Sequence, residues 1–241
     1  MIKKFLEFIN NAKKIAVITG AGISAESGVP TFRGNDGLWK NYRAEDLATP
    51  HAFKKHPEIV WEWYNWRRKL IYKCKPNTAH YYISQLEKKY SDFLLITQNV
   101  DGLHKKAGSK KIIEIHGSIW KIKCVSCGYA TENQDVPLKY PPLCPKCNNI
   151  LRPGVVWFGE ALDYNELSLS INFVVNSDLL IVIGTSGIVQ PVASFPLQAK
   201  NENDNIKIIE INLEKTSVTN YTDLFIQSKA GEFFKRIISN V

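Results

Sequence analysis

Residues 14–28 read Lys-Ile-Ala-Val-Ile-Thr-Gly-Ala-Gly-Ile-Ser-Ala-Glu-Ser-Gly, an apolar run that ends in a glycine-rich turn. Gly20 and Gly22 permit a tight turn and a close approach of the backbone to a pyrophosphate, and a following helix would direct its first N–H groups at that phosphate. The spacing is GxGxxxxxG and not the GxGxxG typical of dinucleotide sites, so a plain strand-to-helix turn is the alternative. The stretch predicts a nucleotide-binding strand, turn and helix.

Five further apolar runs follow the same pattern. Each is nearly continuous in apolar residues, which suits strands buried on both faces of a parallel sheet. A helical pattern lies between some of them, as in Thr78–Tyr90. This alternation predicts an α/β fold, a Rossmann-like doubly wound parallel sheet. The six expected strands are Ile15–Thr19, Phe93–Thr97, Ile112–Ile115, Leu179–Ile183, Ile208–Ile211 and Leu224–Ile226.

Two stretches interrupt the alternation. Residues 35–75 contain no strand run but hold four of the six tryptophans, and residues 121–152 hold four cysteines and four prolines. We expect both stretches to leave the sheet and pack together as a smaller domain, a helical module plus a metal-binding ribbon. Residues 1–34, 76–120 and 153–241 would then form the larger, dinucleotide-binding domain.

The cysteine spacing predicts a metal site. Cys124-x-x-Cys127 and Cys144-x-x-Cys147 are separated by 16 residues, and two such turns close a tetrahedral Cys₄ site. No position is left for water, so we expect one structural Zn²⁺. Residues 1–10 indicate an amphipathic helix and not a signal peptide, which favours a reducing cytoplasm over disulfides. Cys74 is left over and is interpreted as an ordinary buried or half-exposed thiol.

Composition and charge narrow the class of protein. The 241 residues are 44% hydrophobic and 22% charged, which excludes disordered and fibrous proteins, and no apolar run is long enough to span a membrane. The net charge is +8. The lysines are scattered in short pairs, so we expect a solvated basic surface and no nucleic acid as the main partner. A zinc ribbon that binds nucleic acid is the alternative, although the ribbon offers little aromatic surface beyond Tyr129 and Tyr140.

Polar side chains follow two of the expected strands. Gln98-Asn99-Val100-Asp101 comes after one strand and His116-Gly117 after the next, at the carboxyl ends where open α/β sheets bind ligands. Amide and carboxylate groups there can orient a ribose and a carboxamide. A histidine with a pKa near about 6.5 can take a proton from a ribose hydroxyl. Helix-capping roles for Asn99 and Asp101, and a purely structural His116, are the alternatives.

The missing acidic residue points away from hydride transfer. A dehydrogenase of this fold carries an acidic residue about 20 residues after the turn, to hold the ribose. Here the chain instead runs through Val29-Pro30-Thr31-Phe32-Arg33-Gly34, which reads as a loop. A bound dinucleotide is therefore expected to serve another reaction.

Together these motifs resemble the sirtuin family of NAD-dependent protein-lysine deacylases, in the family's order and over nearly the whole chain. The resemblance implies that NAD is a co-substrate, that acylated-lysine proteins are the partners, and that nicotinamide and O-acyl-ADP-ribose are released. We expect a monomer. The matching segments are Gly20–Ser24, Thr31-Phe32-Arg33, Gln98-Asn99-Val100-Asp101, His116-Gly117, the four cysteines, Val155–Glu160, Gly184-Thr185-Ser186 and Asn212-Leu213-Glu214.

The resemblance also implies roles for individual residues. His116 is the expected base, with Asn99 and Asp101 as the other catalytic residues. The segment 155–158 is expected to pair with the substrate peptide as an added strand. The implied peptide contacts are Val156, Trp157, Phe158, Gly159 and Glu160. The implied cofactor contacts are Gly20, Ala21, Gly22, Ile23, Ser24, Glu26, Phe32, Arg33, Trp39, Gln98, Asn99, Val100, Asp101, Gly184, Thr185, Ser186, Asn212, Leu213, Glu214 and Ala230.

Residues 58–72 are predicted to form a helix that would decide which acyl groups the enzyme prefers. Tyr64 and Arg67 lie three residues apart on one partly apolar face, where a guanidinium and a phenol can bind a carboxylate. The stretch resembles the Tyr-x-x-Arg of sirtuins that prefer succinyl-, malonyl- or glutaryl-lysine, and Ala48 matches the small residue that makes room for the acyl chain. Arg68 is expected to be a solvated neighbour. A surface arginine, a deacetylase limited to neutral acyl groups and a mono-ADP-ribosyltransferase are the alternatives.

Overall fold

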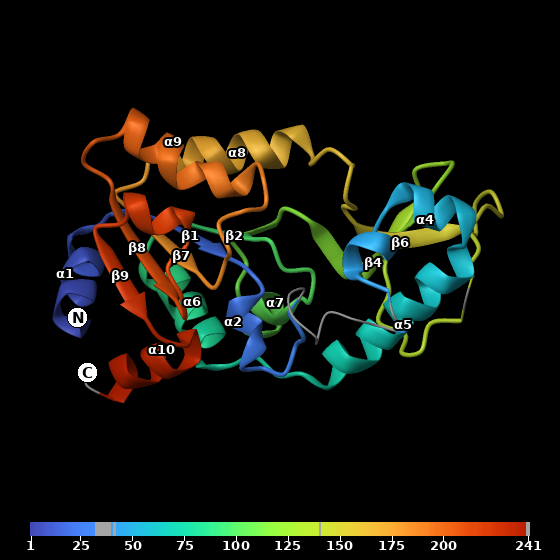
Figure 1. Ribbon diagram of the computed structural model, residues 1–241, viewed down its shortest axis with the longest axis horizontal. Coiled ribbons are helices and arrows are strands. Elements are labelled where there is room, and N and C mark those ends of the chain that lie inside the picture. The colour runs from blue at the N-terminus through green and yellow to red at the C-terminus, as the bar shows by residue number, and fades with distance from the viewer. Residues whose placement is uncertain (32–39, 41, 140, 240–241) are drawn as a thin grey trace.

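A six-stranded parallel sheet forms the larger part of the molecule (Figure 1). The computed structural model describes residues 1–31, 40, 42–139 and 141–239. The sheet order is β3-β2-β1-β7-β8-β9, and all neighbouring strands are parallel. All six expected runs are strands of this sheet: β1 Lys14–Thr19, β2 Asp92–Thr97, β3 Ile112–Glu114, β7 Leu179–Ile183, β8 Lys207–Asn212 and β9 Leu224–Gln227.

Helices cover both faces of the sheet, which confirms the doubly wound fold. Alternate residues of β1 point to opposite faces, so that Ile15 and Val17 enter one hydrophobic core while Ala16 and Ile18 enter another. Both faces are buried, which explains why the strands are continuous in apolar residues. The first core is closed by α1 (Ile2–Asn11), α6 (Thr78–Lys89) and α10 (Ala230–Ser239), and the second by α8 (Tyr164–Val175) and α9 (Phe195–Glu202).

A second region combines the two interrupting stretches. Its helices share one hydrophobic core with a three-stranded antiparallel sheet of order β5-β4-β6. The Trp61 indole N–H donates to the Leu151 carbonyl at 2.8 Å, and the Asn65 amide exchanges two hydrogen bonds with the backbone of Leu138. The elements of this region are α3 Ala44–Leu47, α4 Pro50–Lys55, α5 Pro57–Lys73, β4 Gly117–Cys124, β5 Ala130–Glu132 and β6 Leu151–Val155.

The two expected stretches therefore pack against each other, although the exact division into domains stays a prediction. The expected boundary at residue 120 falls inside β4, and the one at residue 152 falls inside β6. No described helix combines the length and the apolarity needed to cross a membrane. The short elements are α2 Gly22–Ala25, α7 Leu103–Lys106 and the 3₁₀ helices Val192–Ser194 and Ser217–Tyr221.

Candidate active site

The sheet changes its winding direction between β1 and β7, and the expected site residues gather at the carboxyl ends of these strands. The chain leaves β1 toward β2 on one side, and β7 to β9 extend the sheet on the other side of β1. Ligands of doubly wound folds bind at this kind of switch point. In Figure 1 the short helices α2 and α7, which follow β1 and β2, lie between the sheet and α5.

The glycines after β1 are required by a backbone contact with the loop after β7. The Gly22 N–H donates to the Gly184 carbonyl at 2.8 Å. A Cβ atom at Gly20 or Gly22 would lie 2.8 Å from backbone atoms of that loop. The expectation that N–H groups of a following helix face a phosphate finds little support, because α2 has four residues and the N–H groups of Gly22, Ile23 and Ser24 donate within the protein.

Two amides after β2 tie the ends of three strands together. The Asn99 side-chain amide donates to the Gly20 carbonyl at 3.0 Å and to the Ser24 hydroxyl at 3.2 Å. The Gln98 amide donates to the Thr185 hydroxyl at 3.0 Å. The three motifs that the sequence places far apart thus meet at one edge of the sheet.

Asp101 is a buried carboxylate at the same edge. Its Oδ1 accepts the Leu103 N–H at 2.8 Å, which is the turn-capping role that the sequence left open. Burial raises the pKa of Asp101, while hydrogen bonds from Leu103 and Ser24 and the charge of Arg67 oppose that rise. Arg67 and Asp101 carry opposite charges, and each moves the pKa of the other toward its charged form.

The geometry around His116 suits a general base. Its Nδ1 lies 3.0 Å from the Gln98 carbonyl, which can only accept, so Nδ1 carries the proton and Nε2 presents a lone pair. Burial lowers the pKa of His116, and the hydrogen bond to the carbonyl opposes this shift. His116 is therefore held mainly in the neutral form that can accept a proton.

A buried polar layer lies beneath these residues, and in it His104, which follows the Asp101 turn and is expected to be structural, is 2% exposed. His104 Nε2 lies 3.0 Å from the Thr19 hydroxyl, which donates to the Thr97 hydroxyl at 2.8 Å. His80 Nε2 lies 3.4 Å from the Ser24 hydroxyl, and burial lowers the pKa of His80 to about 4. The sequence offers no signal for His80 beyond its position three residues after Asn77, the N-cap of α6.

The remaining cofactor candidates lie at the ends of β7, β8 and α10. The Asn212 amide donates to the Thr185 carbonyl at 2.7 Å, which joins the loops after β7 and β8. Leu213 is exposed beside it. The Glu26 carboxylate accepts the Gly231 N–H at 2.6 Å, next to Ala230, so it stabilises the start of α10. Phe32, Arg33 and Trp39 lie outside the described residues.

Tyr64 and Arg67, which the sequence predicts to bind an acidic acyl group, lie in a buried wall. Tyr64 is 3% exposed and Arg67 is 7% exposed, so neither side chain faces bulk water. The Tyr64 phenol accepts a hydrogen bond from the Trp157 indole at 2.9 Å. Ala48 is also buried, and its carbonyl accepts the Phe158 N–H at 2.9 Å. Residues from α3, α5 and the segment after β6 thus form one wall.

The expectation for Arg68 is wrong. Its side chain is 1% exposed and not solvated, because its guanidinium donates to three backbone carbonyls. These carbonyls belong to Ile119, Asn133 and Asp135, on β4 and the segment after β5. Arg68 therefore joins α5 to the small sheet, while Arg67, one residue earlier, interacts through its charge with Asp101. The helical spacing alone did not separate a buried structural arginine from a solvated one.

The backbone N–H groups of the segment after β6 already form hydrogen bonds within the protein, which the expected pairing with a substrate peptide did not anticipate. The N–H groups of Val156, Trp157 and Phe158 donate to the His116 carbonyl, the Glu160 carboxylate and the Ala48 carbonyl. A peptide strand added here would not find these donors free. Phe158 and Gly159 are exposed, whereas Glu160 forms an ion pair with Arg152.

The four cysteines form the expected metal site. Their Sγ atoms all lie within 4.8 Å of one another, and two of the Sγ–Sγ distances are 3.5 Å. Tetrahedral zinc with Zn–S bonds of about 2.3 Å requires Sγ–Sγ distances of about 3.8 Å, so the cluster fits the ion. The backbone N–H groups of Ser126 and Lys146 point to Sγ atoms in the two turns, as thiolates require. Cys74 lies outside the cluster and is half-buried.

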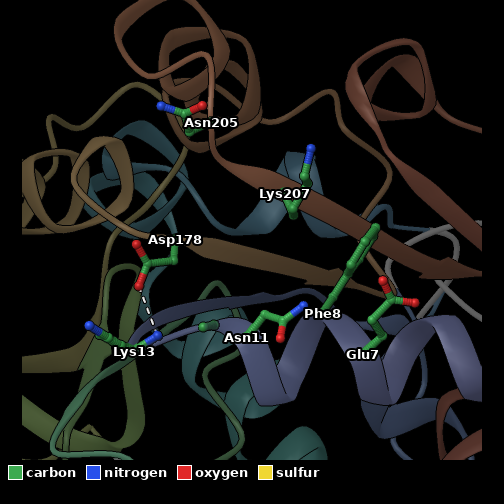
Figure 2. A pocket seen from close by; sticks show the side chains of 8 residues that line it. Glu7, Phe8, Asn11, Lys13, Asp178, Asn205 and Lys207 are labelled. Carbon is green, nitrogen blue, oxygen red and sulfur yellow. Dashed lines mark hydrogen bonds between the residues drawn. The ribbon is translucent and has the colours of Figure 1, made fainter.

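A cavity of about 450 Å³ lies at the opposite, amino edge of the sheet (Figure 2). Its charged side chains are Glu7, Lys13, Asp178 and Lys207, which are of mixed sign. The Asp178 carboxylate already accepts the backbone N–H groups of Lys13 and Lys14, both at 2.8 Å. The candidate catalytic residues lie at the other edge, so we place the active site there.

Comparison with known proteins identifies one family. The model of the Sir2 family matches residues 20–191. The NAD-dependent protein deacylase of Leptospira interrogans serovar Lai is 52% identical over 233 residues, which cover 95% of this chain and 93% of that protein. A crystal structure of a Sir2 homologue with NAD has a TM-score of 0.92 and 46% identity, covering 99% of this chain and 93% of its own.

A Sir2 structure with a p53 peptide and NAD⁺ has a TM-score of 0.89 and 33% identity, and covers 100% of this chain and 98% of its own. The motifs, the sheet with its switch point, and these likenesses agree over the length of the molecule. The chain belongs to the Sir2 family, the sirtuins.

Proposed function

We propose that this sirtuin, an NAD-dependent protein deacylase, prefers protein lysines that carry acidic acyl groups such as succinyl and malonyl, and deacetylates more weakly. The observation that carries the proposal is the burial of Tyr64 and Arg67 in one wall, with Arg67 near the Asp101 carboxylate. An arginine is rarely buried to this extent unless it is paired, and beside Tyr64 it can donate to the carboxylate of an acyl group.

The electrostatics of the wall favour an anionic ligand. Burial lowers the pKa of Arg67, because the guanidinium loses hydration, while the negative charge of Asp101 opposes that shift. A carboxylate supplied by the substrate adds a planar partner to which a guanidinium can donate two parallel hydrogen bonds. A neutral acetyl group cannot do so. The pair therefore distinguishes acyl groups by charge.

The residues at the sheet edge supply the rest of the chemistry. NAD provides the ADP-ribosyl group that accepts the acyl group and releases nicotinamide. His116 Nε2 is the proposed acceptor of a proton from a ribose hydroxyl, because its Nδ1 proton is held by the Gln98 carbonyl. Asn99 and Asp101 are proposed to orient the ribose and carboxamide, since their side chains are fixed by Gly20, Ser24 and Leu103. Positioning and exclusion of water carry much of the effect.

Replacing the arginine tests the acyl preference. In Arg67→Met, kcat/KM for a succinyl-lysine peptide should fall about 10- to 100-fold, since a charge-assisted hydrogen bond contributes about 1.5–3 kcal/mol. The value for the matched acetyl-lysine peptide should change little. Lys69→Met, on the exposed face of the same helix, is the control and should leave both substrates unchanged. Rates are measured with NAD by mass spectrometry of the peptides.

Other outcomes would favour the alternatives. Equal losses on both peptides would remove the carboxylate role. Turnover of acetyl-lysine alone by the unmodified protein would indicate a deacetylase limited to neutral acyl groups. Label from NAD that ends on protein, and not on free O-acyl-ADP-ribose, would indicate a mono-ADP-ribosyltransferase.

A further inference from the structure

The Trp157 side chain touches the acyl-selecting wall through its indole N–H. Its Nε1 lies 2.9 Å from the Tyr64 phenol oxygen, and both residues are 3% exposed. Water cannot replace this hydrogen bond readily at such low exposure. The contact joins the segment after β6 to the middle of α5. In the same segment, the Val156 N–H donates to the His116 carbonyl.

The chemistry of the two groups fixes the direction of the hydrogen bond. An indole can only donate, so the phenol oxygen must accept. The phenol proton is then left for another acceptor, and no second hydrogen bond to Tyr64 is found among the described residues. Burial also raises the pKa of Tyr64, which keeps the phenol protonated. Tyr64 is thus a donor that lacks an acceptor beside the Arg67 guanidinium.

Trp157 is held in place through both its ring and its backbone. The Arg152 guanidinium lies 3.4 Å from the centre of the Trp157 ring, and the Phe53 ring packs at 5.1 Å. Arg152 donates to both carboxylate oxygens of Glu160 and to the Val155 carbonyl. Glu160 Oε2 also accepts the Trp157 backbone N–H at 2.8 Å. Because the indole N–H is fixed against one side of the phenol oxygen, the phenol O–H must point away from the indole.

We propose that Trp157 is a positioning residue for acyl selection: its indole N–H occupies the phenol oxygen of Tyr64 and directs the phenol proton at the carboxylate of an acidic acyl group. Arg152 and Glu160 serve to hold the indole and do not contact the acyl group. This inference rests on the proposed acyl preference, and it assigns to Trp157 a role through Tyr64 in addition to any contact with the peptide.

Replacing the indole by a phenyl ring tests the proposal. In Trp157→Phe the ring can still pack on Arg152 and Phe53, but the donor is lost. We expect the ratio of kcat/KM for a succinyl-lysine peptide to that for the matched acetyl-lysine peptide to fall about three- to tenfold, because a lost contact with the peptide backbone lowers both values alike and cancels in the ratio. The double variant Trp157→Phe/Tyr64→Phe should have the same succinyl-to-acetyl ratio as Tyr64→Phe alone. The reason is that the two substitutions remove the same hydrogen bond, so the second one has nothing further to remove.

A matched control separates this role from a general loss of packing. Trp61→Phe also removes a buried indole hydrogen bond, of 2.8 Å to the Leu151 carbonyl, in the same hydrophobic core. It should lower stability but leave the succinyl-to-acetyl ratio unchanged. An unchanged ratio in Trp157→Phe, equal losses on both peptides, or additive losses in the double variant would overturn the proposal.

A measurement without substrate distinguishes the failure of this inference from that of the proposed function. The Trp157 indole N–H should exchange slowly with solvent in ¹⁵N-labelled protein and faster in Tyr64→Phe, because the phenol acceptor is gone. Fast exchange in the unmodified protein would overturn the inference. Slow exchange together with no acyl preference in the unmodified protein would overturn the proposed function and, with it, the selective role of Trp157.

Discussion

The parallel sheet and the small region differ in what holds them together. The sheet is held by two aliphatic cores on its two faces, with strands such as β7 buried along their whole length. The small region has its own core, but it depends also on single polar side chains that bond to distant backbone groups, namely Trp61, Asn65 and Arg68. The small region therefore adds a few long-range polar contacts to a hydrophobic core of its own.

This difference predicts how much stability each region loses when one side chain is replaced. Loss of a methylene group from a dense aliphatic core costs about 0.5–1.5 kcal/mol, because neighbouring side chains share the change. Loss of a buried donor leaves its acceptors without partners and costs more per side chain. The small region also carries Tyr64 and Arg67, the pair proposed to select the acyl group, so damage to this region should affect the proposed specificity.

Removal of the metal should have the largest effect. Structural zinc contributes about 10–16 kcal/mol to the folding of small zinc modules, so Cys147→Ser or a strong chelator should unfold the small region and abolish deacylation. Five of the six tryptophans lie between residues 61 and 157, in or beside that core. Tryptophan fluorescence should therefore change strongly while the far-ultraviolet signal of the sheet helices persists.

The control for this prediction is Cys74→Ser, which lies outside the cluster and should keep one zinc per chain. Metal analysis of the purified protein measures the stoichiometry. An active, zinc-free protein with unchanged fluorescence would contradict the structural role of the cluster.

Arg68 offers the sharpest contrast with the sheet. Arg68→Met should lower the free energy of unfolding by about 3–5 kcal/mol, because it leaves the carbonyls of Ile119, Asn133 and Asp135 without their donor. Ile181→Val, in the middle of β7, should cost only about 0.5–1.5 kcal/mol. Denaturant unfolding measures both. Similar values for the two variants would remove the distinction between the regions.

The strands of the sheet could be predicted from the sequence because the pattern that indicates them lies within each strand. A strand buried on both faces must be apolar at every position, so Leu179–Ile183 is visible as a strand without knowledge of its neighbours. The four cysteines are visible for a similar reason, since two CxxC turns suffice to bind one metal ion. The convergence of Asn99 and Gly20 followed from the rule that ligands bind at the carboxyl ends of parallel strands.

The remaining features depend on contacts between residues far apart in the chain. Arg67 and Arg68 are identical and adjacent, yet one lies near the site and the other bonds to three carbonyls of the small sheet and its following segment. Only the packing of α5 on β4 decides between them. Glu26 likewise follows the glycine turn but bonds to Gly231, 205 positions away. No local pattern could have indicated either partner.

The junction of the two regions can be tested through the pH dependence of the reaction. His116 lies between β3 of the large sheet and β4 of the small one. Burial lowers the pKa of His116 from its usual 6.5, so the folded protein loses the neutral base only at a pH below that value. The acidic limb of the kcat/KM profile should therefore have its midpoint below 6.5, and activity should be flat above it until another group titrates.

A lowered pKa keeps Nε2 of His116 unprotonated down to a more acidic pH, and only the unprotonated nitrogen can accept a proton. The pH range of activity should therefore extend further toward acidic pH. The profile is measured with both succinyl- and acetyl-lysine peptides. The limb should coincide for the two, because the proposed base acts on the ribose and not on the acyl tail. A limb centred at or above 6.5 would mean that burial does not disfavour the charged imidazole of His116 when the base acts. The two regions would then not exclude water from their junction in the way that their packing implies.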